Sequence, residues 1–365
     1  MKLHSKIYGD KGQDLIVIHG LFGMSDNWNT LGKKFAKYCK VHLIDLRNHG
    51  RSPHSTEFNY EVMCDDLLEY MEDNSIKNPV ILGHSLGGKV AIKFAFTHPD
   101  KIEKLIVADM SPRRYNTDFH QNLLSILYKL NLEDFEKRKE IDTILSSTYK
   151  DKGMRLFLLK NLYRKENKEI AWRFNIDVLL EKVSNIQEAD FIQGVCKIPT
   201  HFIRGGNSNY ITTEDELIIN KHFSDFSIAT IDGVGHWVHA ESPERFYDEV
   251  MCGDVLEYMQ DNKIEKPIIL GHSLGGKVAM KFAFLYPDKI EKLIVADMAP
   301  RRYNTDFHQN LLSTLYRLPL ENFKKREEID SILSSTYKDK GMRLFLLKNL
   351  YRKENKEIAW RFNID

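Results

Sequence analysis

The chain contains a long internal repeat, and this repeat constrains its fold more than any other feature. Residues 61–177 align without a gap to residues 249–365, a span of 117 residues in which 99 are identical and 18 differ. Many differences exchange polar residues, such as Ser75 for Lys263, and others exchange similar apolar residues, such as Val80 for Ile268. A period of this length indicates that most of a domain is present twice, rather than an array of small repeats.

The two copies have different neighbours along the chain. Residues 1–60 precede the first copy and residues 178–248 follow it, whereas no second version of either segment accompanies the second copy. One set of flanking segments can complete only one sheet, and direct connection favours the first copy because its loops close at lower entropic cost. We therefore predict one domain over residues 1–252. We expect residues 249–365 to form a partial duplicate that is incomplete on its own and exposes apolar surface. Disorder, self-association through this surface, and a truncated gene fusion all stay open for it.

Short apolar runs bounded by turn residues alternate with helical patterns, which is typical of an α/β fold with a mostly parallel central sheet flanked by helices. The predicted strands are 15–19, 41–45, 80–82, 105–108, 200–204 and 227–231, and the predicted helices between them are 29–38, 60–72 and 88–97. Residues 110–189 contain no convincing strand, so residues 111–189 are expected to form a helical cap over the strand ends, where ligands bind in open α/β sheets. The helix that begins near Pro243 is expected to run without a break into the second copy and to end near Asp261.

A serine stands on the turn between a predicted strand and a predicted helix, in the sequence Gly83-His84-Ser85-Leu86-Gly87. The two glycines permit a tight turn that lifts Ser85 Oγ above the sheet and directs the Leu86 N–H toward a substrate carbonyl oxygen. Ser85 is thus the candidate nucleophile, and a helix cap is its alternative role. The same motif around Ser273 arises from the repeat and adds no independent support.

A nucleophilic serine needs a base and donors for the oxyanion. His236 follows the last predicted strand within Gly233-Val234-Gly235-His236-Trp237, in the chain order expected for this arrangement, and His239 is the competing candidate. The loop at residues 19–23, His-Gly-Leu-Phe-Gly, should supply the second oxyanion donor, with the Leu21 N–H preferred over that of Phe22.

The acid that orients the base is less obvious. The loop after the strand at 200–204 reads Gly205-Gly206-Asn207-Ser208 and contains no aspartate. Asparagine lacks the charge that stabilises an imidazolium. Asp109, at the end of the strand at 105–108, is the preferred acid, and Asp177, at the end of the cap, is the second candidate. A helix cap or an ion pair with a neighbouring arginine is the alternative role of Asp109.

Taken together, these motifs resemble the α/β-hydrolase superfamily, and more narrowly its YbfF-like serine esterases. The matching strings begin at residues 19 (HGLFG), 45 (DLRNHGRS), 83 (GHSLGGK), 108 (ADMSP), 172 (WRFN), 205 (GGNS) and 235 (GHWVHA). The resemblance covers about residues 1–250. It implies hydrolysis of carboxylic esters, with acyl-CoA thioesters as a further substrate class, through an acyl-enzyme on Ser85 and without a metal or organic cofactor.

The apolar acyl pocket of such an enzyme would be lined by Phe22, Trp172, Phe174, Tyr210 and Trp237. Because the second copy brings Ser273 and Asp297 but no histidine loop and no oxyanion loop, we expect Ser273 to be idle. Two other functions stay open. The chain could be a non-catalytic binding module, or an inactive fusion occluded by the second copy, or it could carry another reaction of this fold, such as C–C bond hydrolysis.

Charge and composition exclude several other classes of protein. The 53 basic residues against 52 acidic residues give a net charge of +1, so there is no positive excess for binding nucleic acid or an anionic membrane. No apolar run is long enough to span a bilayer, and the N-terminal residues lack the apolar core of a secretory signal. We therefore expect a cytoplasmic protein that inserts into no membrane.

Overall fold

The computed structural model describes residues 1–116, 118–189, 192–299, 311, 313–323, 325–353 and 357–361. By its packing, the chain divides into two units, Met1–Ala296 and Asp297–Asp365, each of which is described by itself. The division falls inside the second copy, so residues 249–296 belong to the first unit and the rest of the copy forms the second.

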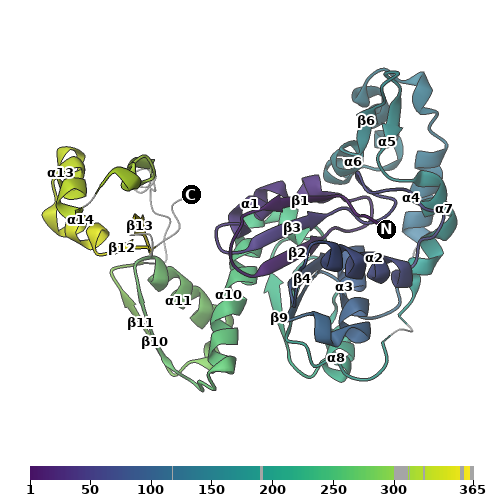
Figure 1. Cartoon of the computed structure of the whole chain (residues 1–365). Coiled ribbons are helices and arrows are strands. Elements are labelled where there is room, and N and C mark those ends of the chain that lie inside the picture. The colour runs from purple at the N-terminus through teal and green to yellow at the C-terminus, as the bar shows by residue number, and fades with distance from the viewer. Residues whose placement is uncertain are drawn as a thin grey trace. The chain divides into compact units, whose positions relative to one another are not determined.

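A seven-stranded sheet in the order β1-β3-β2-β4-β5-β8-β9 forms the centre of the first unit (Figure 1). Its strands are β1 (Ser5–Tyr8), β2 (Asp14–Ile18), β3 (Lys40–Ile44), β4 (Val80–His84), β5 (Lys104–Ala108), β8 (Thr200–Gly205) and β9 (Phe226–Ile231). All six predicted strands are therefore confirmed to within a few residues. β1 was not predicted; it lies at the edge and is the one strand that pairs antiparallel, with β3.

Helices cover both faces of this sheet, because alternate residues of each strand point to opposite sides. Ile16 and Ile81 pack toward α2 (Tyr60–Asp73) and α3 (Leu86–Thr97) on one face. Val17 and Leu82 pack toward α1 (Asn29–Phe35) and α10 (Pro243–Asp261) on the other (Figure 1). α8 (Thr213–His222) and α9 (Val238–Glu241) complete the layers. As predicted, α10 runs from Pro243 to Asp261 as one helix.

The segment after β5 forms the predicted cap, but the cap contains a hairpin that the sequence did not indicate. Its helices are α4 (Asp118–Tyr128), α5 (Arg138–Thr148), α6 (Lys152–Leu159) and α7 (Ile176–Lys182). Strands β6 (Leu162–Arg164) and β7 (Ile170–Trp172) pair antiparallel between α6 and α7. The expectation of a strand-free cap was thus wrong: these strands have three residues each, too few to establish an alternating pattern.

Lys89 joins the two ends of the cap to α3. Its side chain is 1 % exposed. Its ammonium group donates to the backbone oxygen of Arg113, where the cap begins, and to that of Glu188, where the cap ends, at 3.0 Å for the latter. A buried ammonium needs such acceptors, because its desolvation is otherwise costly. The cap is therefore held at both ends by the helix that follows Ser85.

In the described residues, most elements of the first copy recur in the second. β10 (Ile268–His272) and β11 (Lys292–Ala296) pair in parallel with the register of β4 and β5, and α11 (Leu274–Leu285) connects them. In the second unit, α13 (Arg326–Thr336), α14 (Lys340–Leu347), β12 (Leu350–Arg352) and β13 (Ile358–Trp360) reproduce α5, α6, β6 and β7. Nearly identical local sequences therefore give the same helices and strands, with the same bounds.

One face of the β10–β11 sheet exposes apolar side chains to solvent, as the sequence predicted. Leu270 is 67 % exposed and Ile294 is 42 % exposed, whereas their counterparts Leu82 and Ile106 are 0 % and 3 % exposed. In the first copy, α1 and α10 cover this face. This surface is where we expect self-association, which stays a prediction.

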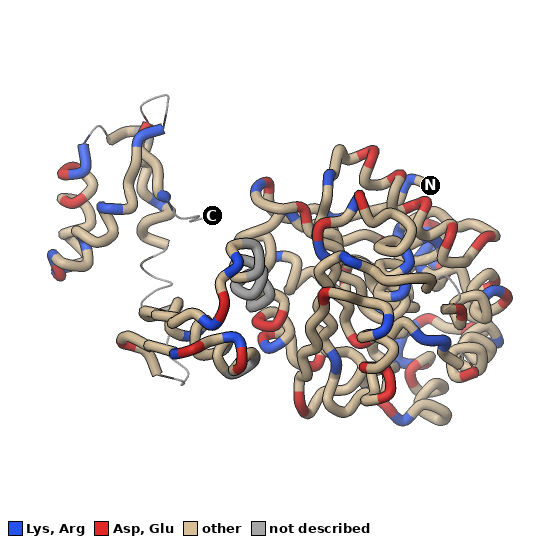
Figure 2. Tube along the Cα trace, turned by 90° about the horizontal axis from the view of Figure 1, so that it is seen from below, with Lys and Arg blue, Asp and Glu red and all other residues tan. Residues whose placement is uncertain are grey.

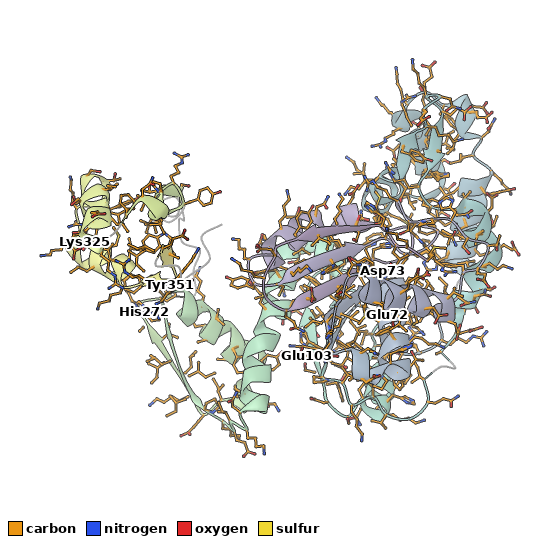
Figure 3. The ribbon with its side chains drawn as sticks, viewed as in Figure 1. Glu72, Asp73, Glu103, His272, Lys325 and Tyr351 are labelled. Carbon is orange, nitrogen blue, oxygen red and sulfur yellow. The ribbon has the colours of Figure 1, made fainter. Side chains whose placement is uncertain are left out.

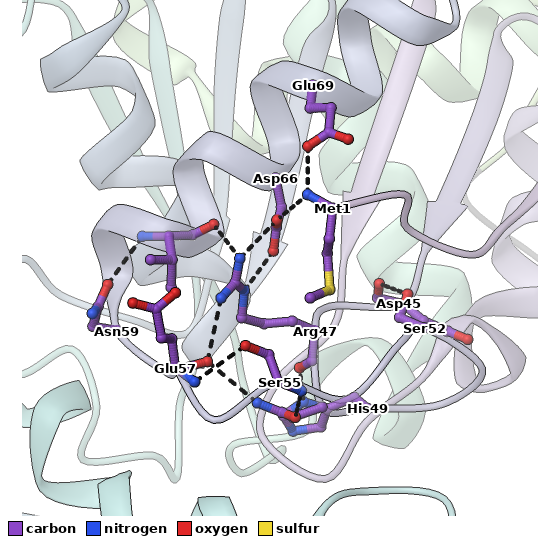
Figure 4. A network of polar contacts seen from close by, with 12 residues as sticks. Met1, Asp45, Arg47, His49, Ser52, Ser55, Glu57, Asn59, Asp66 and Glu69 are labelled. Atoms are coloured by element: carbon purple, nitrogen blue, oxygen red, sulfur yellow. Dashed lines mark hydrogen bonds and ion pairs between the residues drawn. The ribbon is translucent and has the colours of Figure 1, made fainter.

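A buried ion pair ties the loop after β3 to α2 (Figure 4). Arg47 Nε donates to Asp66 Oδ2 at 2.6 Å and Arg47 Nη2 donates to Asp66 Oδ1 at 2.8 Å. Arg47 and Asp66 are 6 % and 1 % exposed, respectively. The two parallel bonds are the bidentate geometry in which Arg–carboxylate pairs are strongest. Figure 2 shows that basic positions (blue) and acidic positions (red) are interspersed along the chain.

The Asp66→Asn substitution should lower the free energy of unfolding of the first unit by about 3 kcal/mol, because it leaves a buried guanidinium without its opposite charge. Asp254→Asn is the matched control, since Asp254 is the counterpart of Asp66 and position 235, 188 residues after Arg47, is a glycine. Urea unfolding monitored by tryptophan fluorescence measures both. If the two substitutions lower the free energy of unfolding equally, the stabilising role of the Arg47–Asp66 ion pair is contradicted.

Candidate active site

Ser85 lies on a strained turn between β4 and α3. Its φ and ψ are 54° and −118°, in the left-handed region that non-glycine residues rarely adopt. Such a conformation costs about 1–3 kcal/mol and persists only when its surroundings fix it. Here the Ser85 N–H donates to the oxygen of Ala108 at 3.1 Å, and its own oxygen accepts from the Lys89 N–H at 3.1 Å. β5 and α3 thus hold the serine in place.

The turn also lies directly against the end of β2. A Cβ atom on Gly87 would lie 2.4 Å from the backbone oxygen of Ile18 and 2.6 Å from that of His19, so only glycine permits this approach. A Cβ atom on Gly20 would lie 3.0 Å from Ser85 Cβ. The loop predicted to supply an oxyanion donor is therefore adjacent to the serine. Leu21 and Ser85 line the same cavity.

Asp109 contacts His236 across the ends of β5 and β9. The distance from His236 Nδ1 to Asp109 Oδ2 is 2.7 Å, and Asp109 is fully buried. Asp109 also accepts hydrogen bonds from the Gly205 N–H at 3.0 Å and from the Ser208 hydroxyl. The second candidate acid, Asp177, is exposed in the first turn of α7.

The ring of His236 is further fixed by its neighbours. Tyr210 stacks on it with ring centroids 3.6 Å apart, and His84 Nε2 lies 2.9 Å from its backbone oxygen. Burial, together with the nearby His239 and His236, lowers the pKa of His84 well below its usual value, so that His84 adds no positive charge beside His236.

His239, the competing base in the sequence, has a different environment. It stacks on Trp28 with ring centroids 4.1 Å apart, and its ring also lies against that of His84. Burial lowers the pKa of His239 to about 3. His239 is thus a neutral, packed side chain in the cavity wall.

The cavity beside Ser85 has a volume of about 380 Å³. Three of the five predicted pocket aromatics, Phe22, Tyr210 and Trp237, line it. Trp172 and Phe174 are not among its lining residues. They stack on each other 5.1 Å apart, and Phe174 packs edge-on behind Phe22 at 5.3 Å. The rest of the apolar wall comes from α4 and α6 of the cap, through Phe119, Leu123, Met154, Phe157 and Leu158.

Sequence reasoning missed two contributions to this site. The Ser208 hydroxyl donates to the buried Asp109, whereas the sequence shows Ser208 only as part of a loop without an aspartate. Phe22 has a φ of 61°, and its backbone oxygen accepts from Asn161 Nδ2 of the cap at 2.8 Å. The position of Ser208 after β8, beside the end of β5, was a usable signal, whereas the contact of Asn161 had none.

The second copy reproduces the turn but not its surroundings. Ser273 has φ and ψ of 53° and −119°, nearly identical to those of Ser85. However, a Cβ atom on Gly275, the counterpart of Gly87, would meet no atom within 4 Å in the part of the chain that the structure describes. His272, labelled in Figure 3, is exposed, whereas His84 is buried. No strand equivalent to β2 pairs with β10 in the described residues.

The described ranges contain neither a metal-binding cluster nor a helix able to span a membrane. No group of three or more His, Cys, Asp or Glu side chains there is placed to hold a metal ion. None of the helices in these ranges combines the length and the apolarity that crossing a bilayer requires.

A serine on a strand–turn–helix, with a carboxylate after β5 and a histidine after β9, two parallel strands separated by β8, defines a hydrolase-type site. The chain belongs to the α/β-hydrolase fold family, whose model matches residues 15–243 and, in a second match, residues 204–327. The first match covers more than half of the chain. This assignment agrees with the resemblance seen in the sequence.

Comparison with individual relatives narrows the assignment from the fold family to the esterases. The chain is 37 % identical to a putative esterase/lipase of Haemophilus influenzae, over 63 % of this chain and 79 % of the relative. It is 31 % identical to the esterase YbfF of Escherichia coli, over 63 % of this chain and 88 % of the relative. A solved structure titled marine microorganism esterase matches with a TM-score of 0.66 and 39 % identity, over 68 % of this chain and 98 % of that chain. The chain thus falls among the carboxylic ester hydrolases of the family, as predicted.

Several buried histidines should make the stability of the first unit depend on pH. Burial lowers the pKa values of His49, His201 and His239 to about 3 each. In the unfolded chain these histidines take up protons below about pH 6.5, whereas in the folded chain they stay neutral down to about pH 3. The folded state is therefore fully stable with respect to these groups above pH 6.5 and loses stability as the pH falls toward 3. Each histidine should lower the free energy of unfolding by about 1.4 kcal/mol per pH unit in this window. Urea unfolding at pH 7, 6 and 5 measures the slope.

The His201→Val substitution removes one of these groups far from Ser85 and should reduce the slope by about 1.4 kcal/mol per pH unit. Thr200→Val, at the neighbouring position of β8, removes no titratable group and is the control, which should leave the slope as it is. A slope that does not respond to the loss of His201 would contradict this origin of the pH dependence.

Proposed function

We propose that this protein is a serine hydrolase that cleaves carboxylic esters through an acyl-enzyme on Ser85. The observation that carries the proposal is the 2.7 Å contact between His236 Nδ1 and the buried Asp109, beside the cavity that Ser85 and His236 both line. A carboxylate on Nδ1 leaves Nε2 free to accept a proton and stabilises the imidazolium that then forms.

The proposed reaction has two halves. Ser85 Oγ attacks the ester carbonyl carbon while its proton passes to His236 Nε2, and the N–H groups of Leu21 and Leu86 bind the oxyanion. The intermediate collapses as the C–O bond breaks and the leaving alcohol takes the proton from His236. Water then attacks the acyl-enzyme, gives its proton to His236, and releases the carboxylic acid as Ser85 regains its hydrogen.

The shape of the cavity supports a carboxylic ester with an apolar acyl group as the substrate. Its wall is largely aromatic and aliphatic, and its volume of about 380 Å³ lies at the small end of the range of ligand pockets. Acyl-CoA thioesters would react by the same steps and are the second substrate class that we propose.

Only the first copy is proposed to be catalytic. Ser273 shares the backbone geometry of Ser85 but is exposed, and no loop equivalent to residues 19–23 lies against it among the described residues. An oxyanion without preorganised donors loses one of the largest contributions to catalysis.

The Ser85→Ala substitution should lower kcat for a short-chain ester by about 10⁴-fold or more, because the acyl-enzyme cannot form. Ser273→Ala is the matched control and should change kcat less than about twofold. A chain that ends at Asp261 should retain activity, and a fluorophosphonate probe should label Ser85 alone. Labelling of neither serine would refute the serine mechanism, and activity that appears only in the shortened chain would favour occlusion by the second copy.

Replacing Asp109 by Asn should lower kcat by about 10⁴-fold while leaving KM nearly the same, since the neutral amide favours the wrong tautomer of His236. Asp177→Asn and Asp297→Asn are the controls, at the alternative acid and at the counterpart in the second copy. Steady-state kinetics on a nitrophenyl ester measure all three. A larger loss for Asp177→Asn than for Asp109→Asn would reassign the acid.

A further inference from the structure

A second, smaller cavity adjoins the main one at Ser85. Its volume is about 40 Å³, which is little more than the share of one water molecule in the liquid, about 30 Å³. Leu86, Lys89, Tyr60 and Tyr115 contribute to its wall. Both cavities share Leu21, Ser85, Asn116, His120 and Tyr210 as lining residues. A substrate bound at Ser85 could therefore place its acyl group in one cavity and a one- or two-atom polar group in the other.

Most polar groups around the small cavity already have partners within the protein. The Tyr60 hydroxyl donates to the oxygen of Ile186 at 2.8 Å, and the Tyr115 hydroxyl donates to that of Tyr210. The Lys89 ammonium donates to two backbone oxygens. Asn116 exchanges hydrogen bonds with Asp118 in the first turn of α4.

His120 is different. Its Nδ1 atom is buried and has no hydrogen-bond partner among the described residues. Its ring lies between Phe119 and Phe22, with centroids 5.5 and 6.4 Å away. Burial, with the nearby His236, lowers the pKa of His120 to about 4, so the ring is neutral near pH 7. A buried polar atom without a partner is costly, by about 1–3 kcal/mol, and such atoms recur where a ligand completes the hydrogen bond.

We propose that His120 binds a hydroxyl group of the substrate alcohol in the small cavity, and thereby makes the enzyme prefer esters of hydroxylated alcohols over esters of plain alcohols. This inference rests on the proposed ester hydrolysis at Ser85. A neutral imidazole can donate to or accept from a hydroxyl without a charged partner. A cavity of about 40 Å³ has room for a hydroxymethyl group but not for a second acyl chain.

The test compares two esters of the same short fatty acid, the 2,3-dihydroxypropyl ester and the propyl ester. The wild-type chain should have a kcat/KM for the dihydroxypropyl ester about tenfold higher, the effect of one hydrogen bond of about 1.4 kcal/mol. The His120→Phe substitution should bring this ratio close to one. The matched control is His308→Phe, at the counterpart position in the second copy, which should keep the wild-type ratio.

A binding measurement separates this inference from the proposed function. In the full-length Ser85→Ala protein, the 2,3-dihydroxypropyl alkyl ether should bind about tenfold more tightly than the matching propyl alkyl ether by calorimetry, and His120→Phe should abolish the difference. If the Ser85→Ala protein distinguishes the two ethers but the wild-type chain hydrolyses neither ester, the esterase proposal is refuted and the inference about His120 is not. Esterase activity with the same ratio in wild-type and His120→Phe proteins would overturn the inference.

If His120→Phe folds poorly, His120→Asn, which keeps a polar group there, should retain part of the preference. An unchanged ratio in that variant would equally count against the inference.

Discussion

The contact between the nucleophile turn and the end of β2 is the constraint on which the rest of the candidate site depends. The Ser85 turn can pack against the backbone oxygens of Ile18 and His19 only because Gly87 has no side chain. This contact brings the loop that follows β2 to within reach of Ser85, and the N–H groups of that loop and of Leu86 can then face one point. The site therefore depends on strand order: β4 lies between β2 and β5, so the serine lies between the loop after β2, which we propose supplies an oxyanion donor, and the carboxylate of Asp109.

The two copies separate what local sequence determines from what tertiary neighbours determine. Ser85 and Ser273 share one strained backbone conformation, as do Asp109 and Asp297, with φ of 48° and 51°. The strain is thus encoded within the repeated segment itself. The burial of the residues around it is not, because it comes from β2, β8, α1 and α10. Position 111 illustrates this difference: the buried Ser111 hydroxyl donates to Asp215 of α8 at 2.9 Å, and the second copy has Ala299 there.

The sequence could predict the elements whose signals are local. The six strands, the turn at Ser85 and the continuous helix α10 all follow from apolar runs, glycines and helical spacing. It could not predict β1, which is only partly buried and lies at the sheet edge, or the short hairpin of β6 and β7 in the cap. Within the site, Asp109 was deduced by elimination. The position of Ser208 after β8 was a usable signal for its contact with Asp109, whereas Asn161 contacts a residue 139 positions away and no local pattern indicates that contact.

The parts of the second copy differ in how far they can fold without neighbours, and the reason lies in the contacts each part makes. The copied cap elements pack on one another: Leu315, Ile329, Leu333, Leu350 and Trp360 are buried in a core that lies within residues 297–365. Helical pairs and hairpins satisfy their backbone groups locally, so this core needs no distant strand. A central pair of parallel strands is different, because both of its faces and both of its edges are normally covered. In β10 and β11 only the face toward α11 is covered, which leaves Leu270 and Ile294 exposed. The incompleteness of the second copy is therefore concentrated in its sheet, which is also the part that would have to carry a second active site.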